Sequence, residues 1–242
     1  MTGQLRRFQF RPVLTAAALI AFAILVTLGS WQLHRLEWKN ALVAKIEARV
    51  AAEPIPFNEA IQRHAAGEDM TYTPVFVEGA YLHDQEAHVF GTLDGRAGYY
   101  IFAPVKTAGD IVYVNRGFAP QAFKDPAQRD DARIAPEKPI VGLFRSAERP
   151  SGVAALVRPE NLPAANQWHV RDPGAFAAHA GLAAVSTAYL DSNGAESAAH
   201  WPKGGTTRVD FNNRHMEYAL TWFGLAATLV CVWFFFSLRK SE

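Results

Sequence analysis

The sequence predicts two membrane-spanning α-helices, paired as a hairpin, that carry one β-rich external domain with a few short helices. Two uncharged apolar runs, 12–33 and 218–238, are each long enough as helices to cross a hydrocarbon core of about 30 Å. Residues 34–217, between them, hold all but one of the 14 prolines and many short β-type runs. We therefore expect an α+β chain whose external domain is mainly antiparallel and barrel-like.

Composition excludes several classes of protein. Half of the 242 residues are apolar, so a packed core is possible, and a net charge of +1 provides no overall field for binding nucleic acid. The single cysteine, Cys231, can form no intrachain disulfide and no cysteine-based zinc site. It falls deep in the second apolar run, where we interpret it as a small buried hydrophobic residue.

The first apolar run has a second interpretation, as a cleaved signal peptide preceded by the pair Arg6-Arg7. A retained span is favoured because the run is longer than a typical signal core and no good small-residue cleavage site follows it. Trp31 and Trp38 near its outer end are typical of anchors at the membrane–water interface.

Basic residues beside both runs indicate the orientation, because positive charges in short flanks favour the cytoplasmic side. The tails 1–11 and 239–242 are therefore predicted to be cytoplasmic and 34–217 periplasmic, in a multi-pass protein of the cell inner membrane. The basic residues of the tails are Arg6, Arg7, Arg11, Arg239 and Lys240, whereas Arg35 and Lys39 on the outer flank weaken the bias.

Periodicity divides the external domain into elements. The helical stripe of the first span continues outward until Pro54, and a short helix is expected around 57–66. Asp172-Pro173 is typical of a further helix start, and Asp94-Gly95 and Gly109-Asp110 indicate hairpin turns. The expected strands are 72–78, 86–90, 99–105, 111–115, 140–144, 167–170, 187–190 and 206–211.

Common catalytic motifs are absent from the sequence, including the nucleophile elbow, the P-loop, the dinucleotide fingerprint and the zincin helix. The closest pair among eight scattered histidines, His83 and His88, has an odd separation that would place the rings on opposite faces of a strand. A membrane-bound periplasmic enzyme is thus disfavoured, and we predict that the chain is not an enzyme.

Five stretches carry a family resemblance: Gly29–Lys39, Tyr72–Gly79, Val114–Pro120, Trp168–Asp172 and Asn213–Gly224. In this order, together with two spans, they make nearly the whole chain resemble the Surfeit-locus (Surf-one type) family of cytochrome c oxidase assembly factors. The stretch Ala147–Asn166 matches poorly, as surface loops often do. The resemblance implies that bacterial members sit in the cytoplasmic membrane, bind haem a and assist its insertion into the oxidase.

The leading hypothesis is therefore an assembly factor that holds haem a near the outer membrane surface. Its implied partners are the catalytic subunit of a haem–copper oxidase and the lipid bilayer, with haem a synthase as a further candidate and nucleic acid excluded. The alternative is a membrane scaffold that stabilises an oxidase subunit without binding haem.

His215 is the residue that the resemblance implicates in haem binding. A neutral imidazole at the membrane boundary can offer a lone pair to iron, so His215 is the expected axial ligand. If its helix begins near Asn213, then Tyr218 and Trp222 fall near the same face and can flank a porphyrin. The small residues Ala219 and Ala226 share that face.

Arg35 lies at a similar membrane depth on the first helix if the two spans are antiparallel. We expect its guanidinium, or the ammonium of Lys39, to meet the haem propionates through charge-assisted hydrogen bonds. Arg214, beside His215, has no assigned role at this point.

Asn115-Arg116-Gly117 is expected to close a strand into a turn. Gly117 would then be required because glycine adopts positive φ without a Cβ clash. We interpret this motif as one that shapes the fold and does not touch haem.

Overall fold

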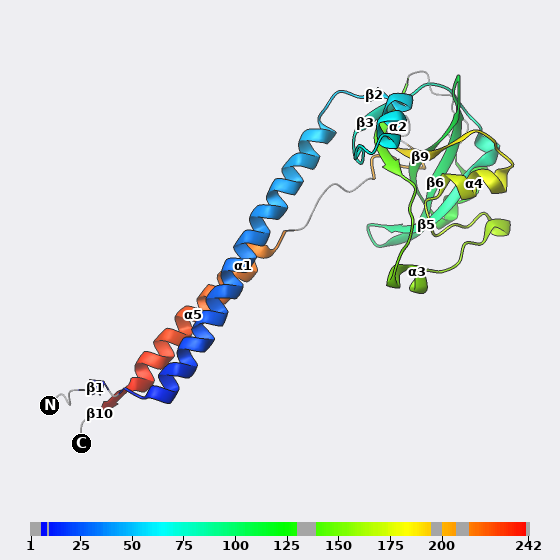
Figure 1. Cartoon of the computed structure of the whole chain (residues 1–242). Coiled ribbons are helices and arrows are strands. Elements are labelled where there is room, and N and C mark those ends of the chain that lie inside the picture. Colours follow the sequence, from blue (N-terminus) through cyan, green and yellow to red (C-terminus); the bar gives the residue numbers. More distant parts are fainter. Residues whose placement is uncertain (1–5, 9, 130–138, 195–199, 207–212, 241–242) are drawn as a thin grey trace. The chain divides into compact units, whose positions relative to one another are not determined.

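The chain is described by a computed structural model that covers residues 6–8, 10–129, 139–194, 200–206 and 213–240 (Figure 1). It divides into two compact units. The hairpin unit comprises Met1–Lys45 and Asp210–Glu242, and the sheet domain comprises Ile46–Val209.

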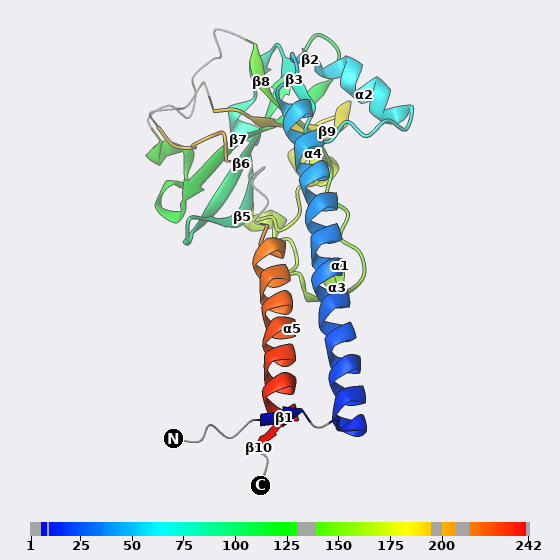
Figure 2. The ribbon, with the colours of Figure 1, turned by 90° about the vertical axis from the view of Figure 1, so that its left-hand side faces the viewer.

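The hairpin unit consists of α1 (Pro12–Val50) and α5 (His215–Ser237), which run side by side (Figures 1 and 2). Both are long and apolar enough to cross a membrane, as predicted. α1 continues well past the predicted span and stops before Pro54, and α5 begins at His215, three residues before its predicted span. At the other end, β1 (Arg6–Phe8) pairs antiparallel with β10 (Leu238–Lys240).

Small residues allow the two helices to approach closely. A Cβ added at Gly29 of α1 would lie 2.8 Å from the ring of Phe223 on α5, and Ala219 and Ala226 are buried. Cys231, which we expected to be buried, is instead exposed. A pair of helices covers only one stripe of each, and Cys231 lies outside that stripe.

The sheet domain contains one mixed, mainly antiparallel sheet with the strand order β2-β3-β8-β9-β7-β6-β4, and β5 also pairs with β6. The pairs β2–β3 and β7–β9 are parallel. The expected closure into a barrel is not observed, because the sheet remains open among the described strands. The strands are β2 (Ile55–Pro56), β3 (Pro74–Val77), β4 (Ala80–Tyr81), β5 (Ala87–Leu93), β6 (Arg96–Lys106), β7 (Ile111–Pro120), β8 (Ile140–Ser146) and β9 (Val185–Ser192).

Two helices pack on separate cores of this sheet. α2 (Phe57–Ala65) contributes Phe57 to a cluster with Val114, whereas α4 (Pro173–Ala180) contributes Phe176 to a cluster with Tyr113. Because neighbouring residues of β7 point to opposite faces, the two clusters lie on opposite sides of the sheet. α4 has the predicted cap, with Asp172 accepting hydrogen bonds from the next turn, and a third helix, α3 (Val153–Val157), is short.

Two expected strands are not confirmed. Residues 167–170 form only isolated bridges, because Trp168 makes backbone hydrogen bonds on both sides of Val89 and the chain then turns into α4. Of the expected strand 206–211, only Thr206 is described, outside any strand, and 207–211 lie outside the described residues.

The predicted turn at Gly117 is wrong in its location. Gly117 lies inside β7, where the pairing with β6 shifts and Arg116 is the extra residue of a bulge. Its φ is +123°, and an added Cβ would lie 1.9 Å from the carbonyl oxygen of Lys203. Glycine is therefore required for backbone reasons, as expected, but at a bulge rather than at a turn.

Candidate functional site

His215 is the first residue of α5, and its half-buried ring meets α1. Its Nδ1 lies 2.8 Å from Oε1 of Gln32, and its backbone N–H donates to Oδ1 of Asn213 at 3.4 Å. In the described part of the chain, Nε2 of His215 makes no hydrogen bond. One ring nitrogen is thus held by the protein while the other is open.

A second amide pair fixes the start of α5. Nδ2 of Asn213 donates to Oδ1 of Asn40 on α1 at 2.8 Å. Further along, the close approach of Phe223 to Gly29 sets the spacing of the helices. These two contacts set how the helices pack, whereas the imidazole itself is contacted by Gln32.

The aromatic face expected beside His215 is only partly available. Because α5 begins at His215, not at Asn213, the imidazole lies at the very end of the helix. Ala219 is 1% exposed, so this part of the face packs against protein and cannot receive a porphyrin. Tyr218 is 50% exposed and Trp222 is half-buried, which leaves an open margin on the side of Tyr218.

Arg35 is exposed on α1, and its guanidinium carbon lies 4.0 Å from the ring centroid of Trp38. It makes no ion pair with another described residue. The structure does not bring Arg35 into contact with His215, but its charge remains available for an external anion.

The neighbouring residue Arg214 now has a structural role. Its Nη2 lies 2.9 Å from Oε2 of Glu217, across the first turn of α5. Glu217 is also placed to interact favourably with the positive end of the helix dipole.

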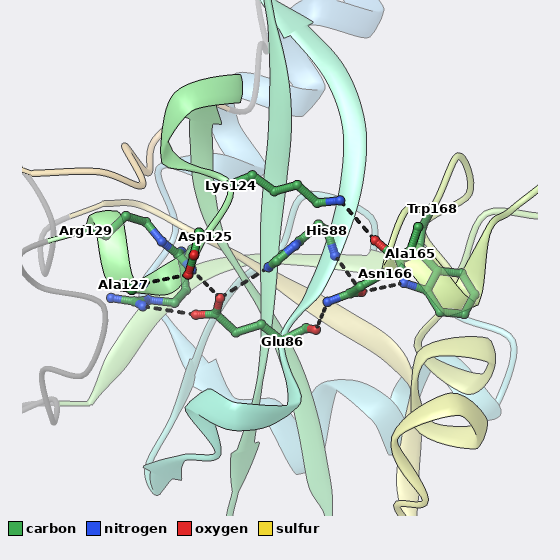
Figure 3. Close-up of polar contacts among 10 residues, drawn as sticks. Glu86, His88, Lys124, Asp125, Ala127, Arg129, Ala165, Asn166 and Trp168 are labelled. Atoms are coloured by element: carbon green, nitrogen blue, oxygen red, sulfur yellow. Dashed lines mark hydrogen bonds and ion pairs between the residues drawn. The ribbon is translucent and has the colours of Figure 1, made fainter.

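A buried ion cluster in the sheet domain was not anticipated from the sequence (Figure 3). The carboxylate of Glu86 lies 2.5 Å from Nη2 of Arg129, 3.7 Å from Nη1 of Arg116 and 3.4 Å from Nε2 of His88. All four side chains are at most 7% exposed. One carboxylate thus serves two buried guanidinium groups, which makes the cluster sensitive to the loss of Glu86.

The surroundings of Glu86 favour its ionised form. Burial by itself raises the pKa of this carboxyl, but the hydrogen bond with His88 and the charge of Arg129 outweigh it, so the pKa lies below its ordinary value. The buried ion cluster is thus charged, and its role is structural.

Asn166 connects this ion cluster to the loop before α4 (Figure 3). Its amide nitrogen donates to the backbone oxygen of Glu86 at 2.7 Å, and its Oδ1 accepts from Trp168 Nε1 at 3.0 Å. The motif residues Arg116 and Trp168 therefore act in packing the sheet domain.

No group of three or more metal-binding side chains occurs among the residues that the structure describes. His83 lies in a short 3₁₀ helix rather than on a strand, and His88 is buried in the ion cluster. The prediction that the chain is not an enzyme stays a prediction.

Sequence reasoning missed Gln32 and Glu86. Gln32 lies within the stretch Gly29–Lys39, yet nothing in the sequence pairs it with His215, since the two are 183 residues apart. The segment around Glu86 resembles an ordinary strand start, and its contacts come from residues far along the chain, namely Arg116, Arg129 and Asn166.

The fold defines a protein with two long apolar helices, both candidates for membrane spans, and one mixed-sheet domain. The model of the SURF1 family matches residues 19–227, and the chain belongs to this family. It is 32% identical to Surfeit locus protein 1 of Homo sapiens over 225 residues, which cover 86% of this chain and 72% of the human protein. It is also 32% identical to the Mus musculus protein of the same name, with 88% and 72% covered. A SURF1-like protein of Drosophila melanogaster is 29% identical, with 86% and 72% covered.

Proposed function

We propose that this chain is an assembly factor for a haem–copper cytochrome c oxidase that binds haem a and assists its insertion into the catalytic subunit. Membership of the SURF1 family supports the role in oxidase assembly. The observation that carries haem binding is the His215 ring, which is held at Nδ1 and open at Nε2. The bilayer and the oxidase catalytic subunit are the proposed partners, with haem a synthase as a further candidate.

The residues around His215 fit a haem group in part. Nε2 would bind the iron, the open side of Tyr218 and Trp222 would contact the macrocycle, and Arg35 would pair with a propionate. When bound, the haem would supply the iron that His215 coordinates. The chain's own contribution would be to hold and orient it.

His215→Ala is expected to leave the protein folded and inserted, because the ring is at the edge of the helix pair. Haem a that co-purifies with the full chain from cells producing it should fall by at least about 10-fold, since the axial ligand is lost. The measurement is the visible spectrum per mole of purified protein.

His34→Ala is the matched control, because His34 also lies on the hairpin, but it is exposed and its Nδ1 lies 2.9 Å from Ser30 O of its own helix. It should retain the haem. If His215→Ala keeps its haem content and its Soret band, His215 is not the ligand, and if the wild type carries none, the scaffold alternative holds.

We further propose that the tails 1–11 and 239–242 are cytoplasmic and that the sheet domain is periplasmic. The pairing of β1 with β10 supports a common side for both tails, and their basic residues favour the cytoplasm. A reporter fused after Lys240 should be active in the cytoplasm, and one inserted within Gly91–Gly95 should be active in the periplasm. The reverse pattern would contradict the inner-membrane topology.

A further inference from the structure

We infer that Gln32 is the residue that sets the tautomer of His215 and so keeps Nε2 available to iron. The inference rests on the proposed function and extends it to a positioning residue on the other helix. Gln32 touches neither iron nor porphyrin in this role; it acts through the imidazole.

The hydrogen bond between His215 and Gln32 decides which ring nitrogen carries the proton. The group facing Nδ1 at 2.8 Å is the carbonyl oxygen Oε1 of Gln32, which has lone pairs and no proton to donate. Nδ1 must therefore carry the proton. A neutral imidazole has a single N–H, so the lone pair of the ring lies on Nε2.

The contacts around His215 also hold the orientation of its ring. Rotation of the ring would break the hydrogen bond to Gln32. The contact of Phe223 at Gly29 further resists a change in the spacing of the helices. The tautomer and the direction of Nε2 are thus set before any ligand binds.

The group that accepts the hydrogen bond from His215 also affects the basicity of its ring. Histidines that bind metals commonly donate their other N–H to a carboxylate, a carbonyl or water, which fixes the ring and raises its basicity. Gln32 provides an uncharged carbonyl, so it orients the ring while raising its basicity less than a carboxylate would. Such a ligand suits a protein that must release its haem.

A competing interpretation treats the bond between Gln32 and His215 as interhelical packing alone. Asn40→Leu provides the control for it. This variant removes the neighbouring hydrogen bond between the side-chain amides of Asn40 on α1 and Asn213 just before α5, and it does not touch the imidazole. Gln32→Met removes the amide oxygen while keeping the length of the side chain.

The first experiment uses the full chain without haem, with ¹⁵N-labelled histidine, in nanodiscs above pH 8. The ring nitrogen shifts of His215 should show the Nδ1–H tautomer in the wild type and in Asn40→Leu, and a mixture of tautomers in Gln32→Met. An Nε2–H tautomer in the wild type, or an unchanged tautomer in Gln32→Met, would overturn the inference whether or not the protein binds haem.

The second experiment titrates haem a into the same proteins. Gln32→Met should bind about 10-fold more weakly with a shifted Soret band, whereas Asn40→Leu should bind as the wild type does. Equal weakening in both variants would assign Gln32 to packing alone. Haem retained by His215→Ala would instead reject His215 as the ligand, and a wild type that binds no haem would refute the proposed function. The tautomer result would stand apart from both outcomes.

Discussion

Gly117→Glu is expected to prevent the sheet domain from folding stably. The residue has φ of +123°, which strains any side chain by about 1–3 kcal/mol, and its Cβ would overlap the carbonyl oxygen of Lys203. It would also bury a carboxylate beside the bulge of β7. The level of full-length protein and its thermal unfolding in detergent measure the effect, and we expect a loss of more than about 3 kcal/mol.

Gly67→Glu provides the control for strain alone. Gly67 also has positive φ, at +94°, but an added Cβ there meets no atom within 4 Å. This variant should cost about 1 kcal/mol or slightly more, from the backbone conformation only. If Gly117→Glu accumulates normally with an unchanged melting temperature yet fails in oxidase assembly, the bulge is a functional surface and not a structural one.

The elements that the sequence predicts well are those with strong local signals. The long helices α1 and α5, the helix α2, the cap at Asp172 and the hairpin turn at Asp94-Gly95 follow from apolar run length, periodicity and turn chemistry. The stretch 167–170 has β-type composition, but a strand needs partners along its whole length. Only Trp168 finds a bridge to β5, so composition alone misleads there.

The site divides in the same way. His215 follows from a motif, and the general position of Tyr218 and Trp222 follows from helical spacing. The partner Gln32 does not, because pairing across 183 residues depends on the register of two helices, which no local pattern states. The burial of Ala219 and Ala226 likewise depends on where α1 packs, and it removes much of the face that spacing alone offered to a porphyrin.

Glu86→Ala is expected to cost about 3–5 kcal/mol, because it removes the carboxylate that lies against the buried guanidinium group of Arg129 and near that of Arg116. The measurement is unfolding of the full chain by urea, followed by near-ultraviolet circular dichroism. Glu68→Ala is the matched control. Its 2.6 Å bond to Arg63 is on the surface, where water screens the charges, so the loss of this ion pair should change the stability far less.

The pH dependence of the stability of the wild type is a second test of the buried ion cluster. The pKa of Glu86 is lower in the folded protein than in the unfolded chain, so its ionised form contributes stability that is fully present above the ordinary carboxyl pKa. That contribution is lost as the pH falls below this value and through the folded pKa, where protonation removes the charge that faces Arg129. Below about pH 4.5, therefore, the wild type should lose stability more steeply than Glu86→Ala, which has no such proton to bind. The contrary result would be parallel curves of stability against pH for the two proteins, together with a small effect of the substitution at neutral pH. It would show that the ion cluster does not stabilise the fold and that the two guanidinium groups find other partners.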